Sequence, residues 1–258
     1  MAEYISGSEE KFVKEMNKKV KELGLKHTRF SNSTGLDQDS HYSSAYDMAI
    51  IAKELVINHP EILEFSSIYE DYLRENTANK FWLVNTNKLV SQYEGTDGLK
   101  TGHTDDAGYC LAATVKRNNL RFIAIVLGEN DSKVRNKETI DLLDYGFNSV
   151  KVKTLKKKNT IIDKVYLDKS KEKGINVLLK DDLNVIEDTD SDNKYSYEID
   201  LKEVNIPVKK NDVLGTIKVK IKNNIIAKQE LISDRDANKL SLIDLFKNNV
   251  LNVIFGNI

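Results

Sequence analysis

The sequence has little of several features that mark particular classes of protein. It holds a single cysteine, Cys110, among 258 residues, so no disulfide can form within the chain. No uninterrupted apolar run reaches the length of about 18 residues that a membrane-crossing helix needs. The first stretch, MAEYISGSEEKF, lacks the basic start and long apolar core of a signal peptide. Cys110 itself lies in the apolar run GYCLAA, which favours a small buried side chain over a reactive thiol.

Neither sign of charge is in excess. Lys and Arg number 39 and Asp and Glu number 40, which gives a formal net charge of -1. No basic stripe with interleaved aromatic residues is present, so nucleic acid is not an expected partner. The densest positive cluster, KVKTLKKKN at 151–159, is interpreted as a solvated strand edge or linker.

Amphipathic helices are expected at the start of the chain. Apolar side chains in residues 8–23 recur at helical spacing behind a capping serine, Ser8. A second helix is expected from Ser43 or Ser44 to the break at His59-Pro60, and a short helix follows. This part of the chain is therefore predicted to be mainly helical.

The pattern then becomes strand-like. Apolar and β-branched runs alternate with turn residues in FWLVNT, GYCLAATVKR and LRFIAIVLG, with Asn118-Asn119 at a hairpin tip. FWLV and CLAATV have the composition of core strands. Residues 131–147 return to helical spacing. Residues 1–150 are therefore expected to form a mixed unit with helices on a mainly antiparallel sheet, in the α+β class.

Two further segments are expected after Val150. Short alternating strands separated by charged or Asn-rich turns predict a small all-β, sandwich-like module at 151–236. The remaining residues, 237–258, contain KLSLIDLFKNNVLNVIFGNI, with apolar side chains on one helical face. This amphipathic helix is too short and too polar to span a bilayer, and it can pack on the β module or lie at a membrane surface.

The sequence Lys100-Thr101-Gly102, preceded by a turn-like TDG, is the first motif with chemical content. It is not a phosphate loop, because Leu99 precedes the lysine and a strand follows the threonine. A cation and a hydroxyl at a strand edge can hold a substrate carboxylate, and glycine lets a substrate backbone approach closely. Lys-Thr-Gly on a strand is one of three elements of the penicillin-recognising serine acyltransferases.

The other two elements, S-x-x-K and S-x-N, are matched only in unsuitable places. S-x-x-K occurs at Ser8/Lys11, Ser170/Lys173 and Ser191/Lys194, and SDN occurs at Ser191 to Asn193. The motif needs its serine at the start of a buried helix, whereas Ser8 is better explained as a helix cap and the others lie in charged loops. All these matches are therefore interpreted as chance.

Several ordered segments together resemble a known family. NSTGLDQDSHYSSAYDMAIIAKEL, VNTNKLV, GTDGLKTGHTDDAGYCLAATVKRNNLRFIAIVLG and RNKETIDLLDYGF are similar to the D-alanyl-D-alanine carboxypeptidases, the low-molecular-mass penicillin-binding proteins. The resemblance covers about residues 2–150, and the β module and final helix fit the remainder. It implies part of a penicillin-binding/β-lactamase-like catalytic domain at 1–150, a small β domain at 151–236 and a membrane-surface helix at 237–258.

The resemblance also implies an activity. In the family, a serine attacks the penultimate D-alanine carbonyl of the peptidoglycan stem peptide, expels the terminal D-alanine, and water hydrolyses the acyl-enzyme. No metal or cofactor takes part. The implied partners are stem peptides ending in D-Ala-D-Ala, β-lactams in the full-length family, and the membrane surface through the last helix. The implied location is the cell envelope, at the outer face of the cytoplasmic membrane.

Site residues follow from the same resemblance. Asn87 is expected to be structural. The backbone N–H of His103 is expected to form one half of an oxyanion hole. The residues expected to bind the substrate are Lys100, Thr101, Gly102, Arg135 and Asp37.

One departure from the family pattern is decisive for activity. Family members carry S-x-x-K and S-x-N before the segment equivalent to AEYISGSEEKF, where this sequence begins. The nucleophilic serine, its lysine and the second serine are therefore expected to be absent, and the chain is expected to expose apolar surface and to show neither turnover nor acylation by β-lactams. Two alternatives are a non-catalytic envelope scaffold or pseudoenzyme, and one half of a split enzyme.

Overall fold

The computed structural model describes residues 1–167 and 170–241. The chain divides into two compact units, Met1–Ser149 and Val150–Ile258. Within the described ranges, no helix is long and apolar enough to cross a membrane. The amphipathic helix expected at 237–258 lies, from residue 242 onward, outside the described residues. Before that point, Lys239 forms an isolated β-bridge with Ser170.

Six helices are described in the first unit. Two of them begin at predicted capping serines: the Ser8 hydroxyl accepts from the Lys11 N–H at 3.3 Å, and the Ser44 hydroxyl accepts from the Asp47 N–H at 3.2 Å. The helices are α1 (Ala2–Ser6), α2 (Glu9–Glu22), α3 (Ala45–Asn58), α4 (Ile62–Ser66), α5 (Leu89–Gln92) and α6 (Ser132–Ser149).

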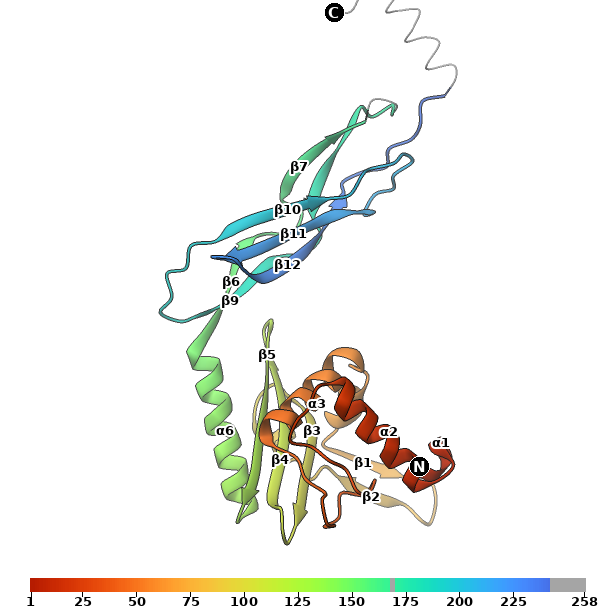
Figure 1. Ribbon diagram of the computed structural model, residues 1–258, viewed down its shortest axis with the longest axis vertical. Helices are drawn as coiled ribbons and strands as arrows, with labels where there is room; N and C mark the ends of the chain where they lie inside the picture. Colours follow the sequence, from red (N-terminus) through yellow and green to blue (C-terminus); the bar gives the residue numbers. More distant parts are fainter. Residues whose placement is uncertain (168–169, 242–258) are drawn as a thin grey trace, which may run out of the picture. The chain divides into compact units, whose positions relative to one another are not determined.

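A three-stranded antiparallel sheet is the centre of this unit. Its strands, in spatial order, are β3 (Thr96–Thr104), β4 (Gly108–Arg117) and β5 (Leu120–Glu129). Figure 1 shows α6 and α3 on opposite sides of this sheet. Alternation along β4 directs Leu111, Ala113 and Val115 towards α6, where they pack with Ile140 and Leu143. The expected helices on an antiparallel sheet are confirmed.

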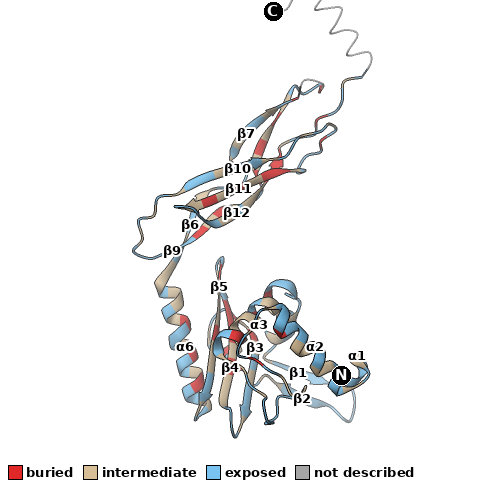
Figure 2. Ribbon diagram, viewed as in Figure 1, coloured by how far each residue is buried: buried red, intermediate tan, exposed pale blue. Residues whose placement is uncertain are grey.

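A separate hairpin, β1 (Glu70–Leu73) with β2 (Phe81–Val84), corrects one expectation. The FWLV run was expected in the core, but Phe81, Trp82 and Leu83 are 54%, 56% and 41% exposed. The reason is tertiary: within the described residues β2 pairs only with β1, and every strand position of β1 is exposed. Figure 2 shows that buried positions gather instead on the β3–β5 sheet and α6. The turn-like TDG is likewise part of a strand, β3.

The second unit is the expected all-β module. Buried positions alternate along its strands, as in β8, where Ile175, Val177 and Leu179 are buried. Its five-stranded sheet has the order β10-β11-β12-β8-β7, β6 pairs with β9, and both sheets contribute to one core. The segment KVKTLKKKN mostly forms β6. The strands are β6 (Val150–Lys156), β7 (Ile161–Tyr166), β8 (Gly174–Leu179), β9 (Leu183–Asp188), β10 (Ser196–Leu201), β11 (Val213–Ile221) and β12 (Asn224–Ser233).

Candidate active site

Strand β3 directs Lys100 and Thr101 to opposite faces of the sheet. Thr101 lies opposite Leu111 in the β3–β4 ladder, and Leu111 packs with Ile140 of α6. Directly paired residues point to the same face, so Thr101 points to the α6 face. Lys100 lies opposite Ala112 and points to the α3 face. The register changes at a bulge between Thr96 and Gly98, which therefore sets the phase of the whole strand.

The Lys100 ammonium remains at the exposed edge of β3. Its Nζ donates to the Thr101 carbonyl oxygen at 2.6 Å, and no carboxylate in the described part of the chain pairs with it. Gly102 is also exposed, and a Cβ there would meet only the Cys110 Cβ, at an ordinary 3.8 Å. The packing of the described residues therefore does not require glycine at this position, and the exposed backbone is open to close approach from outside.

His103 follows on the same face as Thr101. It lies opposite Tyr109, and the two rings are tilted at 40° with their centroids 4.1 Å apart. This contact packs the histidine ring against a side chain of β4.

Arg135 is a buried cation that has no carboxylate partner in the part of the chain that the structure describes. Arg135, Thr139 and Leu143 are the buried residues of α6, and their four-residue spacing places them on the face that packs on the sheet. Arg135 is only 5% exposed, and its Nε and Nη2 donate to the neutral Asn136 Oδ1 at 3.1 and 2.8 Å. Across residues 1–167 and 170–241, no carboxylate pairs with it.

The electrostatics of Arg135 reflect this environment. Burial lowers the pKa of its guanidinium, while the nearby Cys110 thiol and Tyr109 phenol act in the opposite direction. Those two residues begin β4, so Arg135 lies at the end of the sheet where Thr101 and His103 are found. A guanidinium that is desolvated but bonded only to an amide is a ready partner for an incoming carboxylate.

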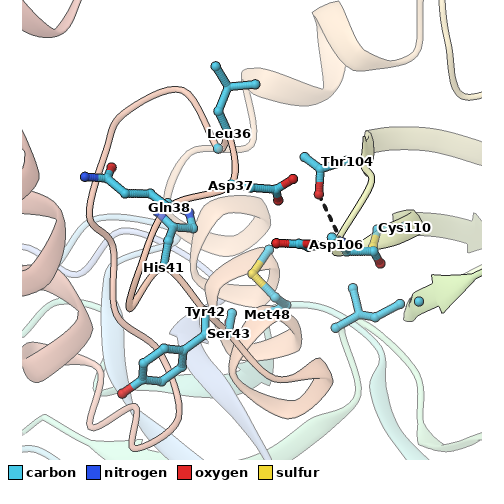
Figure 3. Close-up of a pocket in the computed structure, with 14 residues that line it drawn as sticks. Leu36, Asp37, Gln38, His41, Tyr42, Ser43, Met48, Thr104, Asp106 and Cys110 are labelled. Atoms are coloured by element: carbon cyan, nitrogen blue, oxygen red, sulfur yellow. Dashed lines mark hydrogen bonds between the residues drawn. The ribbon is translucent and has the colours of Figure 1, made fainter.

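Asp37 lines a cavity of about 470 Å³. The cavity lies between the loop that carries Asp37, the side chain of Met48 from α3, and the turn between β3 and β4. In Figure 3 Asp37 points from the loop towards Thr104 at the end of β3 and Asp106 in the turn that follows. The described lining includes Cys110 on the α3 face but none of Lys100, Thr101 and Arg135. The structure thus separates the predicted residues into two groups.

The sequence-derived set omits one contact of the site. The hydroxyl oxygens of Thr86 and Thr101 are 2.6 Å apart. The available signal was the polar triplet Asn85-Thr86-Asn87 directly after the apolar FWLV run. Asn87, expected to be structural, is 1% exposed, and its side-chain amide donates to the Gly98 carbonyl oxygen at 3.0 Å.

The S-x-x-K serines have local structural roles or no partner. Ser8 caps α2, and the hydroxyl of Ser170, which is buried, donates to Glu172 at 2.5 Å. The buried Ser191 hydroxyl oxygen has no hydrogen-bond partner within the described residues. Ser170 and Ser191 belong to the second unit, whereas Lys100 and Arg135 belong to the first.

Three features define the class of this protein: a helix-covered antiparallel sheet with Lys-Thr-Gly on an edge strand, a buried arginine on the helix that packs on this sheet, and a separate β module. Comparison with known families agrees. Residues 1–131 match the family described as D-alanyl-D-alanine carboxypeptidase, and residues 151–239 match the C-terminal domain of penicillin-binding protein 5. The chain belongs to the D-alanyl-D-alanine carboxypeptidase family.

Individual relatives support this membership. The chain is 45% identical over 249 residues to D-alanyl-D-alanine carboxypeptidase DacF of Bacillus subtilis (strain 168), covering 96% of this chain and 64% of the relative. It is 36% identical over 235 residues to DacA of Escherichia coli (strain K12), covering 90% and 57%, respectively. The chain thus spans less than two thirds of the length of these curated relatives.

Solved structures share the fold. A peptidoglycan synthesis regulatory factor (PBP3) from Streptococcus pneumoniae aligns with a TM-score of 0.77 at 25% identity, covering 92% of this chain and 72% of that chain. Penicillin binding protein 5 from Haemophilus influenzae aligns with a TM-score of 0.60 at 29% identity, covering 92% and 69%.

Proposed function

We propose that this chain carries the substrate-carboxylate side of a serine-type D-Ala-D-Ala carboxypeptidase that trims the terminal D-alanine of peptidoglycan stem peptides. The observation that carries the proposal is Arg135: it is 5% exposed, its side-chain partner is a neutral amide, and it lies on the same sheet face as Thr101. The terminal carboxylate of the substrate supplies the anion that this guanidinium lacks.

Each residue then has a distinct role in binding. The guanidinium of Arg135 and the hydroxyl of Thr101 donate to the terminal carboxylate. The ammonium of Lys100 adds positive potential from the other side of the strand, and Gly102 admits the peptide backbone. The backbone N–H of His103 supplies one donor to the oxyanion that forms when the penultimate carbonyl is attacked. Asp37 lines a separate cavity near the turn between β3 and β4, and its proposed place near the bound substrate rests on the family resemblance alone.

The binding role is tested by ligand discrimination. A capped D-Ala-D-Ala peptide and its C-terminal amide differ only in the carboxylate, so NMR titration of the 258-residue chain should show preference for the acid. Arg135→Met should abolish this preference. Lys137→Met on the same helix is the matched control, because Lys137 is 71% exposed and pairs with Asp141. Equal affinity for acid and amide in the wild-type chain would refute the proposal.

The 258-residue chain by itself is proposed to be without turnover and to resist acylation by β-lactams. The support is that Ser8 is occupied as a cap, Ser170 is bonded to Glu172, and Ser191 starts no helix. Removing a nucleophile leaves only binding and oxyanion contributions. Labelling with a fluorescent penicillin followed by denaturing electrophoresis tests this: a covalent band at the mass of the chain would identify one of these serines as a nucleophile. One half of a split enzyme would instead regain labelling when the complementary half is added.

The same proposal assigns 1–150 to the catalytic domain, 151–236 to a β module and 237–258 to a membrane-surface segment in the cell envelope. Support for the last assignment is the apolar helical face within residues 239–258. Liposome flotation of the chain with and without residues 240–258 tests it, since equal flotation of the two forms would exclude membrane binding by this segment.

A further inference from the structure

Thr86 lies within hydrogen-bonding distance of the proposed carboxylate-binding hydroxyl. Its Oγ1 is 2.6 Å from Oγ1 of Thr101, and either oxygen can be the donor. Thr86 is part of the segment that follows β2, whereas Thr101 is in the middle of β3, so the contact joins two separate elements. The motif Lys-Thr-Gly itself gives no information about this partner.

The backbone around Thr86 is held from both sides by asparagine side chains. The Asn85 amide donates to the carbonyl oxygens of Ser66 and Ile68 at 3.1 and 2.9 Å, and its Oδ1 accepts from the Asn87 N–H at 2.9 Å. Asn87 donates to the Gly98 carbonyl oxygen on β3 at 3.0 Å. These bonds fix the segment to both the end of α4 and the strand that carries Thr101. Thr86 therefore has little freedom to move away from Thr101.

We infer that Thr86 is a positioning residue that fixes the side-chain torsion of Thr101 and directs its proton to the substrate carboxylate; this inference rests on the proposed function. A hydroxyl has one proton and two lone pairs. When Thr101 donates to a carboxylate, its own oxygen can still accept a proton, and Thr86 is placed to donate it. Donation in series polarises each hydroxyl and strengthens the outer bond.

The alternative arrangement of protons shows why Thr86 must be a donor. If Thr101 donated to Thr86, its proton would be used within the protein and its oxygen would face an incoming carboxylate with lone pairs only. A side chain of the same shape without a hydroxyl, as in Thr86→Val, removes the internal donor. Thr86→Ser keeps it. The pair of variants therefore separates the hydroxyl from the shape of the side chain.

The first test needs no ligand. Three-bond couplings to the Thr101 methyl group, measured by NMR on the 258-residue chain, report its χ1 rotamer. One rotamer is expected in the wild type and in Thr86→Ser, and averaging between rotamers in Thr86→Val. Thr154→Val is the matched control, because Thr154 makes an exposed hydroxyl bond of 2.7 Å to Asn184 in the second unit. Rotamer averaging in the wild type, or an unchanged rotamer in Thr86→Val, would overturn the inference.

The second test links Thr86 to the carboxylate. Thr86→Val should weaken binding of the capped D-Ala-D-Ala acid by about 3- to 10-fold and leave the weaker binding of its amide unchanged, while Thr86→Ser should restore the acid affinity. Equal losses for acid and amide would mean that Thr86 is merely structural. If the wild type bound both ligands equally, the proposed function would fail, whereas the rotamer experiment would still decide whether Thr86 positions Thr101.

Discussion

Arg121 on β5 holds both carboxylate oxygens of Asp97 on β3, with each nitrogen-to-oxygen distance at 2.7 Å. The same guanidinium reaches the Thr114 hydroxyl on β4 at 2.5 Å. One side chain therefore ties all three strands together at the end of β3 that precedes Lys100. The pair is about three-quarters buried on both sides, so water screens it only partly.

Arg121→Met is therefore expected to destabilise the first unit by about 1–3 kcal/mol, because it leaves a largely buried carboxylate and hydroxyl without their donor. Urea unfolding followed by tryptophan fluorescence measures this, with Trp82 as the sole indole. Disrupting the exposed pair of α6 through Lys137→Met should change the stability by less than about 0.5 kcal/mol. Equal effects of the two variants would show that the Arg121 contact adds nothing beyond a surface ion pair.

Asn87→Ala should cost about 2 kcal/mol. The side chain is 1% exposed, donates to the Gly98 carbonyl oxygen and accepts from the Leu89 N–H at 3.2 Å, so its loss leaves two buried backbone groups unpaired. The comparison is Asn58→Ala, whose amide donates to Glu54 at an exposed position. Chemical denaturation of both variants gives the difference, and a cost for Asn87→Ala no larger than that for Asn58→Ala would argue against a buried structural role.

In the second unit, the Tyr195 phenol donates to the Glu187 carboxylate, and this hydrogen bond raises the pKa of Tyr195 to about 12. A raised folded-state pKa means that the bond stabilises the fold fully below the ordinary tyrosine pKa near 10 and loses this effect as the pH rises through about 12. An ultraviolet titration of tyrosinate should therefore contain a late step that Tyr195→Phe diminishes, with Tyr93, whose pKa is also raised by burial, accounting for part of the remainder. Tyr166→Phe, on an exposed side chain, should leave that step in place.

Glu187 gives the acidic counterpart. The Tyr195 hydrogen bond lowers the pKa of Glu187, with Lys153 and Lys151 acting in the same direction. A lowered folded-state pKa contributes stability above the ordinary glutamate pKa, and that contribution disappears as the pH falls through the lowered value. The free energy of unfolding of Glu187→Gln should thus be lower than that of the wild type at neutral pH, and this difference should become smaller as the pH is lowered. Denaturant midpoints of both proteins at several pH values measure it. A difference that does not depend on pH would contradict the assignment.

Arg135→Met is expected to change stability in the direction opposite to most core substitutions. The guanidinium is desolvated and has no anionic partner among the described residues, so methionine of similar length should leave the unfolding free energy unchanged or raise it by about 1 kcal/mol. Thermal unfolding of the ligand-free chain checks this. Destabilisation by more than about 2 kcal/mol would assign Arg135 a structural role instead.

Features set by neighbouring residues in the chain could be predicted from the sequence. The caps at Ser8 and Ser44, the hairpin at Asn118-Asn119 and the all-β second unit all follow from short-range patterns. The exposure of Trp82 could not be predicted in this way, because composition predicts a strand but not whether another layer covers it. The burial of Arg135 depends on how α6 packs on β4. The sequence pattern of the helix does not show whether an arginine on it is solvated or buried.

Thr86 is a similar case. Its contact with Thr101 requires the end of β2 to lie beside the middle of β3, a relationship fixed by amides of Asn85 and Asn87 and not by any periodic pattern. The Lys-Thr-Gly motif identifies the strand that we propose binds the substrate carboxylate. The residue that we infer orients Thr101 comes from another element.

The bulge between Thr96 and Gly98 determines which face of the sheet each side chain of Lys-Thr-Gly points to. Because a strand has a two-residue repeat, deleting one residue at the bulge would turn Lys100 towards α6 and Thr101 towards α3 while leaving the motif intact. The Lys100 ammonium would then lie on the same face as the Arg135 guanidinium, and the Thr101 hydroxyl would lie on the opposite face of the sheet. Two chains can therefore share this motif and still present its lysine and threonine on exchanged faces of the sheet, according to one residue upstream.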